Sequence, residues 1–221
     1  MTKSELKLDL KHNTVLSSIL QMPDEAGGLV IFAHGSGSSR LSPRNNYVAK
    51  ILTEHHIATV LTDLLTASED SKHENRFNIA LLTDRLIKVT ELALEQSSLQ
   101  YLPVGYFGAS TGAAAALQAA ALLQDAVKAV VSRGGRPDLA KQALPEVTAA
   151  TLLIVGSLDP DVIELNRQAF AMMKCKKEMK IVEGASHLFE EPGKLHQVAQ
   201  LAAEWFEQNL LVPVVLKNNT K

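Results

Sequence analysis

An alternation of short apolar runs with longer, helically patterned segments constrains this chain more than any other feature of its sequence. From residue 29 onward the short runs are continuously apolar, which is typical of parallel strands covered on both faces. Segments with helical periodicity separate them. This order predicts an α/β protein with a doubly wound, mostly parallel sheet of about eight strands and helices on both faces.

The elements can be placed along the chain. The first two apolar runs are separated by Lys11-His12-Asn13, which indicates an antiparallel hairpin at one edge of the sheet. The expected strands are Leu6–Leu10, Val15–Leu20, Leu29–His34, Ile57–Leu61, Pro103–Gly108, Val127–Ser132, Thr151–Gly156 and Met179–Glu183. The expected helices are Asn45–His55, Arg76–Glu95, Thr111–Leu123, Asp161–Lys174 and Lys194–Gln208.

Length and composition favour a single domain over residues 1–221. A chain of 221 residues with 46% hydrophobic content can bury a full core. The connection from Ser132 to Pro145 is short, so we expect no large inserted lid. The tail LLVPVVLKNNTK is unusually apolar for a terminus. We expect it to pack on its own domain, or to contact a second copy, so that the protein is a monomer or a homodimer.

Charge and cysteine content exclude several classes of protein. A formal charge of −2 with 21% charged residues provides no basic surface for nucleic acid. The first residues lack the apolar core of a signal peptide, and no run reaches the roughly 18 apolar residues of a membrane helix. The single cysteine, Cys175, excludes an internal disulfide and suits a reducing compartment. We therefore expect a cytoplasmic protein with neither nucleic-acid nor membrane partners.

The stretch Gly108-Ala109-Ser110-Thr111-Gly112 matches the pattern G-x-S-x-G at the junction of an expected strand and an expected helix. In this pattern a strained turn exposes the serine hydroxyl above the sheet. Glycine suits the positions two residues before and after the serine, because side chains there would clash where strand and helix approach. The sequence therefore predicts Ser110 as a nucleophile.

A nucleophilic serine needs a base and a group that orients the base. On this type of fold the expected order is serine, acid, histidine. Asp159 follows the strand TLLIVG and His187 follows the strand at MKIVE, so both lie at the sheet edge expected for Ser110. We predict Asp159 as the acid and His187 as the base.

Each of these assignments has an alternative. Asp159 precedes Pro160 and could instead cap a helix, a task that Asp161 could also perform. Asp63, which follows the strand IATVL, is the best substitute acid. His187 could be a solvated loop histidine.

The anionic intermediate of acyl transfer needs backbone donors. The amide of Thr111 directly after the nucleophile is one candidate, and the amide of Ser36 in the loop FAHGSGSSR is the other. His34 is expected to support this loop through hydrogen bonds. A phosphate-binding role for the loop is disfavoured, because GSGSSR lacks the third glycine of the dinucleotide motif. No metal-binding motif is present and no cofactor is expected.

Together, HGSG after a strand, G-x-S-x-G, G-x-x-D and a late histidine resemble the α/β-hydrolase family. The segments HGSGSSRLSPRN, DLLT and SRGGRPDLA resemble more narrowly its dienelactone-hydrolase-like branch, over roughly Val15 to Gln208. The resemblance implies Ser110 as nucleophile, Asp159 as acid and His187 as base. Dienelactone hydrolases carry a cysteine nucleophile where this chain has serine, so the resemblance leaves the substrate open.

Arginines flank the expected cleft. Arg133 ends a strand, and Arg136, Arg40 and Arg44 lie in nearby loops. A guanidinium group binds carboxylate or phosphate through two parallel hydrogen bonds, so we hypothesise a small ester-like substrate with an anionic group, bound by Arg40, Arg133 and Arg136. The alternative is that these arginines pair with local carboxylates such as Asp138.

Three functions fit the pattern. The first is a serine hydrolase that cleaves a small ester, thioester or lactone. The second is a non-catalytic module of the same fold that binds a small molecule or a partner, which would have no need of the three catalytic residues. The third is an acyltransferase or perhydrolase with the same residues. Specificity depends on pocket walls that the sequence does not place.

Overall fold

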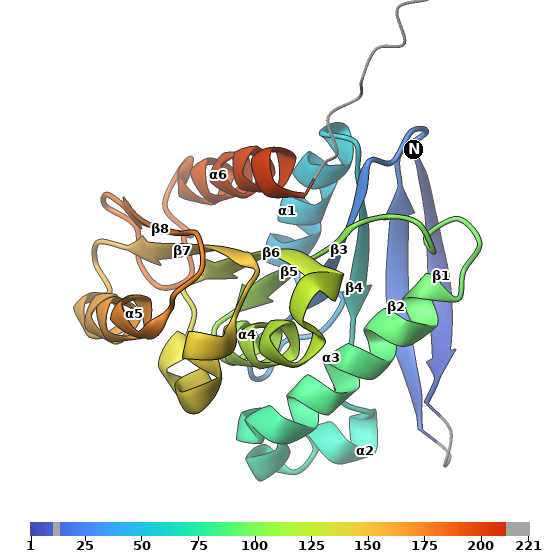
Figure 1. Ribbon diagram of the computed structural model, residues 1–221, viewed down its shortest axis with the longest axis horizontal. Helices are drawn as coiled ribbons and strands as arrows, with labels where there is room; N and C mark the ends of the chain where they lie inside the picture. The colour runs from blue at the N-terminus through green and yellow to red at the C-terminus, as the bar shows by residue number, and fades with distance from the viewer. Residues whose placement is uncertain (11–13, 211–221) are drawn as a thin grey trace, which may run out of the picture.

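The computed structural model describes residues 1–10 and 14–210, and its eight strands form one sheet (Figure 1). Across the sheet the order is β1-β2-β4-β3-β5-β6-β7-β8. Strand β2 pairs antiparallel with β1 and β4, and all other neighbours pair in parallel. The strands are β1 Thr2–Asp9, β2 Val15–Met22, β3 Gly28–Ala33, β4 Ile57–Thr62, β5 Val104–Ala109, β6 Val127–Arg133, β7 Ala150–Gly156 and β8 Lys177–Val182.

Helices cover both faces of the sheet. Helices α1 and α6 pack on one face, and α3, α4 and α5 lie on the other (Figure 1). The helices are α1 Pro43–Glu54, α2 Ala67–Asp70, α3 Ile79–Leu94, α4 Thr111–Leu123, α5 Pro160–Met172 and α6 Lys194–Asn209. Three 3-10 segments are η1 His73–Phe77, η2 Gln124–Ala126 and η3 Pro137–Glu146. The predicted doubly wound, mostly parallel sheet of eight strands is confirmed.

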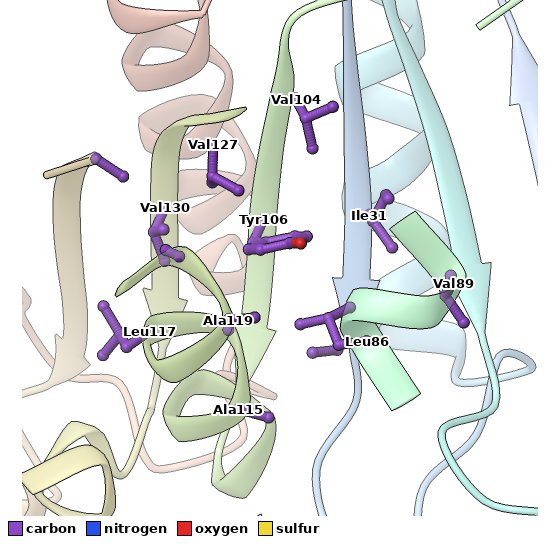
Figure 2. Packing of buried hydrophobic residues seen from close by; sticks show 14 of the residues in the cluster. Ile31, Leu86, Val89, Val104, Tyr106, Ala115, Leu117, Ala119, Val127 and Val130 are labelled. Atoms are coloured by element: carbon purple, nitrogen blue, oxygen red, sulfur yellow. The ribbon is translucent and has the colours of Figure 1, made fainter. Parts of the chain in front are cut away.

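The core on the α3 and α4 face combines a close helix with large strand residues. Figure 2 shows Tyr106 of β5 among Ile31 of β3, Leu86 of α3 and Ala119 of α4. The Tyr106 ring is fully buried, and its hydroxyl is hydrogen-bonded to that of Thr90 at 2.7 Å, which satisfies the only polar atom of the side chain. The run of buried alanines in α4 lets this helix approach β5 closely. The fold thereby fixes the turn that joins the two.

Short elements account for most differences from the sequence prediction. The helix expected from Arg76 begins at Ile79, because the side chain of Asn78 accepts a hydrogen bond from the amide of Leu81 at 3.1 Å and caps it. Strand β1 begins at Thr2, four residues before the predicted start, as an exposed edge strand. Helix α2 and η3 were not predicted from the sequence, since segments this short carry little periodic signal.

The structure tests the expectation that no large lid is inserted after β6, but not the expectations for the hairpin turn and the tail. Between β6 and β7 the described chain forms the loop at residues 134–136 and the 3-10 segment η3, so it has no large lid there. Both the hairpin turn at residues 11–13 and the apolar tail after Leu210 lie outside the described residues. Among the helices within residues 1–10 and 14–210, none combines the length and apolar character that a membrane crossing requires.

Candidate active site

The side chains singled out in the sequence follow neighbouring strands at one edge of the sheet. Strand β3 leads to Ser36, β5 to Ser110, β7 to Asp159 and β8 to His187. Because the carboxyl ends of parallel strands meet at the same edge, the fold brings these distant segments together.

Ser110 occupies a strained backbone conformation between β5 and α4. Its φ is 50° and its ψ is −123°, outside the regions that residues other than glycine normally adopt. The strain turns the chain sharply from strand into helix, as the G-x-S-x-G pattern predicts. A cost of about 1–3 kcal/mol is typical for such a residue, so the surrounding structure must hold it in place.

Two glycines make the tight turn sterically possible. A Cβ atom on Gly112 would lie 2.2 Å from the carbonyl oxygen of Ala33 in β3, and one on Gly108 would lie 2.4 Å from Cα of Ala113. Both distances are far below van der Waals contact. The absence of side chains at these two positions therefore lets strand, helix and the loop after β3 pack around Ser110. This loop, residues 34–42, holds the predicted donor Ser36 and is called the oxyanion loop below.

The loop after β6 holds the backbone of Ser110 from both sides. The amide of Ser110 donates to the carbonyl oxygen of Arg133 at 3.3 Å, and the amide of Arg136 donates to the carbonyl oxygen of Ser110 at 3.0 Å. Asn166 of α5, which is fully buried, donates from Nδ2 to the carbonyl oxygen of Gly135 at 3.0 Å. These bonds connect the strained turn to β6 and α5.

Sequence reasoning missed Asn166. It occupies the apolar stripe of α5, between Val162 and Ala169, where a buried aliphatic residue would fit the helical pattern. An asparagine at such a position is the signal that could have identified it, because buried amides normally hold a specific hydrogen-bonded partner.

Asp159 and His187 are in direct contact. The distance from Nδ1 of His187 to Oδ2 of Asp159 is 2.6 Å, and the aspartate side chain is 17% exposed. An ionised carboxylate only accepts hydrogen bonds, so Nδ1 carries the proton and Nε2 is left free to accept one. This is the arrangement that orients a histidine base.

The alternative roles for these residues are not what the structure favours. Asp159 stands at the N-cap position of α5, but its side chain makes no capping hydrogen bond. Asp63, the substitute acid, binds Arg40 through an Oδ2 to Nη1 distance of 2.6 Å, and it is Asp159 that contacts His187.

Ser110 and His187 share a cavity of about 230 Å³ at the carboxyl edge of the sheet. This volume is below the roughly 300–1,000 Å³ of pockets for drug-sized ligands, so the cavity suits only a small molecule or part of a larger one. The side chains and backbone around it come from the loops after β3, β5, β6 and β8. The residues that line it are Gly35, Ser36, Ser38, Ser42, Arg44, Ala109, Ser110, Arg133, His187 and Leu188.

The oxyanion loop is held by His34 and contacts Ser110. The amide of Leu64 donates to Nε2 of His34 at 3.1 Å, so Nδ1 carries the proton and donates to the carbonyl oxygen of Gly35 at 2.9 Å. Burial lowers the pKa of the His34 imidazole. His34 thus supports the loop through hydrogen bonds, as the sequence predicts, and does so as a neutral ring. Gly35 lies so close to Ser110 that an added Cβ would be 2.9 Å from the serine Cβ.

The amide of Ser36 is occupied in this conformation. It donates to Oγ1 of Thr111 at 3.0 Å. A developing oxyanion near Ser110 would therefore have to share this donor with the threonine hydroxyl or take it over. The exchange replaces one hydrogen bond by another to a charged acceptor, which is usually the stronger of the two.

The structure separates the predicted arginines. Arg40 pairs with Asp63, and the guanidinium of Arg136 forms two hydrogen bonds of 2.8 Å with Asp138, which raises the pKa of Arg136. Neither arginine is among the residues that line the cavity. The local-carboxylate alternative therefore fits both. Arg133 differs, since it lines the cavity with Ser110.

The other histidines and the cysteine lie elsewhere. His55 pairs with Glu207 and His196 contacts the hydroxyl of Tyr47, both on the exposed surface of the α1 and α6 side. His12 is outside the described residues. Cys175 is half-buried with its Sγ near Thr151, and burial raises the pKa of its thiol.

Comparison with known proteins identifies the family. A model of the α/β hydrolase fold matches residues 28–176, a segment that contains the oxyanion loop, Ser110 and Asp159. The chain belongs to the α/β-hydrolase family.

A solved structure defines the branch more closely. The chain is 50% identical to a dienelactone hydrolase from Anabaena variabilis, with a TM-score of 0.91 over 95% of this chain and 98% of the other. The chain is thus a member of the dienelactone-hydrolase-like branch, as the sequence motifs indicate. Est1E from Butyrivibrio proteoclasticus shares the fold, with a TM-score of 0.79 at 16% identity over 92% of this chain and 98% of that one.

Two curated relatives are longer proteins. The chain is 56% identical, over 194 residues, to a protein named putative phosphoribosyl transferase in two strains of Mycobacterium tuberculosis. The match covers 88% of this chain and 44% of each relative. This chain therefore spans less than half the length of those relatives.

Proposed function

We propose that this protein is a serine hydrolase that cleaves a small ester, thioester or lactone through an acyl-enzyme. The family and its dienelactone hydrolase relative support hydrolase activity. The observation that carries the serine mechanism is the 2.6 Å contact between Asp159 and His187, at the rim of a cavity that His187 shares with the strained Ser110.

In the proposed reaction Oγ of Ser110 attacks the substrate carbonyl carbon while Nε2 of His187 takes the hydroxyl proton. Asp159 holds the ring in the required tautomer and stabilises the imidazolium. The amide of Thr111, with that of Ser36 once its bond to the threonine hydroxyl is exchanged, donates to the oxyanion. Each such donor typically contributes about 3 kcal/mol of transition-state stabilisation.

Collapse of the tetrahedral intermediate breaks the bond to the leaving group, which receives the proton from His187. A water molecule then attacks the acyl-enzyme, with His187 again as the base, and releases the acid and free Ser110. If an alcohol or peroxide attacks instead, the same residues perform acyl transfer or perhydrolysis.

The name of the mycobacterial relatives does not by itself assign phosphoribosyl transfer to this chain, because the matched segment is only 44% of their length. We further propose that residues 1–221 form one domain, on the grounds of the one continuous sheet, and that the protein is cytoplasmic, on the grounds of its single cysteine. A monomeric or homodimeric state remains the expectation from the apolar tail of the sequence.

Reaction with a fluorophosphonate tests the proposal, because this reagent forms a stable adduct with an activated serine. We expect one adduct, located on Ser110 by mass spectrometry, and none in Ser110→Ala. His187→Ala should abolish labelling on the same time scale. Asp159→Asn keeps the side-chain shape and should slow labelling by about 10³–10⁴-fold, because the histidine then adopts the wrong tautomer.

Ser97→Ala, at an exposed position after α3, is the matched control and should label like the wild type. A folded wild-type protein that forms no adduct would reject the serine mechanism. In that case, silence across a panel of esters together with a ligand-induced rise in melting temperature would favour the non-catalytic binding module.

A further inference from the structure

Arg133 is a buried cation without a carboxylate partner among the described residues. It ends β6, is 7% exposed, and makes one weak hydrogen bond from Nη2 to Oδ1 of Asn45 at 3.5 Å. Its Nε and Nη1 atoms are buried and have no hydrogen-bond partner in the described part of the chain. Buried charges are normally paired, so this side chain needs an explanation.

Other arginines near this edge of the sheet show the contrast. Arg40, Arg76, Arg85 and Arg136 each form an ion pair with an aspartate or glutamate. The charge that acts on Arg133 is instead that of a second cation, Arg44. Burial and the repulsion from Arg44 together lower the pKa of Arg133 to about 10, so the guanidinium remains protonated at neutral pH.

Arg44 also has a donor to spare. Its Nη1 pairs with Oε1 of Glu190 at 2.8 Å on the exposed side, while its Nε is buried and unpartnered in the described structure. Ser42 accepts a hydrogen bond from the amide of Asn45 at the start of α1, which leaves its own hydroxyl proton free to donate.

The residues that carry these donors line the cavity that contains Ser110. Arg133, Arg44, Ser42 and Ser38 line it together with Ser110 and His187. Of the described residues that line this cavity, none is acidic. The cavity therefore combines a reactive end at Ser110 with an end rich in cationic and hydroxyl donors.

We propose that the Arg133 end of this cavity binds an anionic oxygen group, a phosphate or a carboxylate, carried by the substrate whose acyl bond Ser110 attacks. The inference rests on the proposed hydrolase function and names its substrate class. An oxyanion bound there would accept hydrogen bonds from the guanidinium groups at the cavity wall and would neutralise the two neighbouring cations.

The arrangement has a consequence for stability. A cation buried without a partner destabilises the free protein, and a bound anion removes that penalty. Replacing Arg133 by Met, which has a similar length and no charge, should therefore raise the melting temperature of the ligand-free protein by about 2–4 °C.

Binding can be measured without turnover. Inorganic phosphate and succinate, each compared with sodium chloride at equal ionic strength, should raise the melting temperature of the wild type and of Ser110→Ala. Arg133→Met should lose this rise, and the half-exposed Arg44→Met should lose part of it. Arg167→Met, on the exposed surface of α5, is the matched control and should keep it.

Kinetics then distinguish the two kinds of anion. We compare 4-nitrophenyl hydrogen succinate and 4-acetoxyphenyl phosphate with the neutral ester 4-nitrophenyl butanoate. Because the leaving groups of the two charged esters differ, the ester whose kcat/KM depends more strongly on Arg133 identifies carboxylate or phosphate as the favoured group. Arg133→Met should lower kcat/KM for the preferred charged ester by about ten- to hundredfold more than for the neutral ester, and the control Arg167→Met should leave kcat/KM for both esters unchanged.

The results distinguish failure of the anion subsite from failure of the proposed hydrolase function. No stabilisation by either anion, or a charged-ester preference unchanged in Arg133→Met and Arg44→Met, would overturn the subsite. Stabilisation that depends on Arg133, in a protein that hydrolyses no ester and forms no fluorophosphonate adduct, would support the subsite and reject the hydrolase.

Discussion

The strain at Ser110 lies in its backbone dihedral angles and does not depend on the side-chain hydroxyl. With φ at 50° and ψ at −123°, any residue with a Cβ is disfavoured at this position, whether or not it can attack a substrate. The conformation is imposed by packing of the turn between β5 and α4, and by backbone hydrogen bonds to Arg133 at the end of β6 and from Arg136 in the loop after it. The backbone conformation that presents the Ser110 side chain at the sheet edge therefore lowers the stability of the fold.

This backbone strain predicts the relative stability of two inactive variants. Ser110→Gly relieves the strain, while Ser110→Ala retains it. After the larger entropy of glycine in the unfolded chain is subtracted, Ser110→Gly should be more stable than Ser110→Ala by about 1 kcal/mol. Urea denaturation of the two purified variants measures the difference.

An Ala-to-Gly change at an ordinary helical position provides the control. Ala171→Gly, made in the Ser110→Ala background at an exposed position of α5, should lose about 1 kcal/mol. Opposite signs at the two positions would demonstrate backbone strain at Ser110. Equal losses at both would contradict it.

At the scale of single residues, the sequence identifies candidate reactive side chains more readily than it identifies which charged side chains form ion pairs. The order and placement of Ser110, Asp159 and His187 after strands identify candidates, because strand ends can be located from apolar runs. Arg133 and Arg136 look equivalent in the sequence SRGGRPD. Only the structure separates them, since Asp138 binds Arg136 and no carboxylate reaches Arg133 among the described residues.

At the scale of the elements, the junction of β5 and α4 leaves the least space for side chains. A Cβ on Gly112 would meet backbone atoms of β3, which cannot move without distorting the sheet. Gly112→Ala should therefore lower the free energy of unfolding by about 1–3 kcal/mol and should also displace Ser110, which reduces fluorophosphonate labelling. Urea denaturation and the labelling rate measure the two effects.

A substitution at a second glycine distinguishes the effect of a steric clash from the cost of a positive φ. Gly37 has a φ of 69°, and a Cβ there would meet only Nη1 of Arg76, at 3.9 Å. Gly37→Ala thus measures the cost of a positive φ without a backbone clash. A Gly112→Ala variant that retains wild-type stability and labelling would show that the turn between β5 and α4 tolerates a side chain, contrary to its packing.

Periodicity explains which elements the sequence could predict. Helices α1, α3, α4, α5 and α6 have 12 to 16 residues and present apolar positions at helical spacing. Helix α2 has four residues, and η3 is interrupted at Lys141, so neither has a periodic face. For the same reason, the sequence could not predict that the loop at residues 134–136, which precedes η3, forms a hydrogen bond with the backbone of Ser110.

At the scale of the whole molecule, the parallel sheet brings together residues that are far apart in the sequence. Residues after β3, β5, β6, β7 and β8 gather at one edge because right-handed crossovers return each strand in the same direction (Figure 1). The sequence predicts this edge without specifying distances. Cavity shape, donor occupancy and ion pairs depend on side-chain packing between distant segments, which a pattern in one chain does not encode.

His34 couples this edge to the stability of the entire fold. It is buried between the oxyanion loop and the chain after β4, where it accepts from Leu64 and donates to Gly35. Burial is the main cause that lowers its pKa below the ordinary value of 6.5, while the bond to Gly35 and the charges of Asp63 and Asp70 oppose the shift. Above about pH 6.5 the ring is neutral in the folded and the unfolded chain, so the full stability is present.

Below that pH the unfolded chain binds a proton that the folded protein excludes. The free energy of unfolding should therefore fall with decreasing pH, by up to about 1.4 kcal/mol per pH unit from this residue, until the folded pKa is reached. Urea denaturation between about pH 7.5 and pH 5 measures the slope. His34→Gln, whose amide oxygen can still accept from Leu64, should flatten the slope relative to the wild type, whereas His55→Gln replaces a surface histidine as the control. Parallel slopes for the wild type and His34→Gln would mean that other groups cause the acid sensitivity.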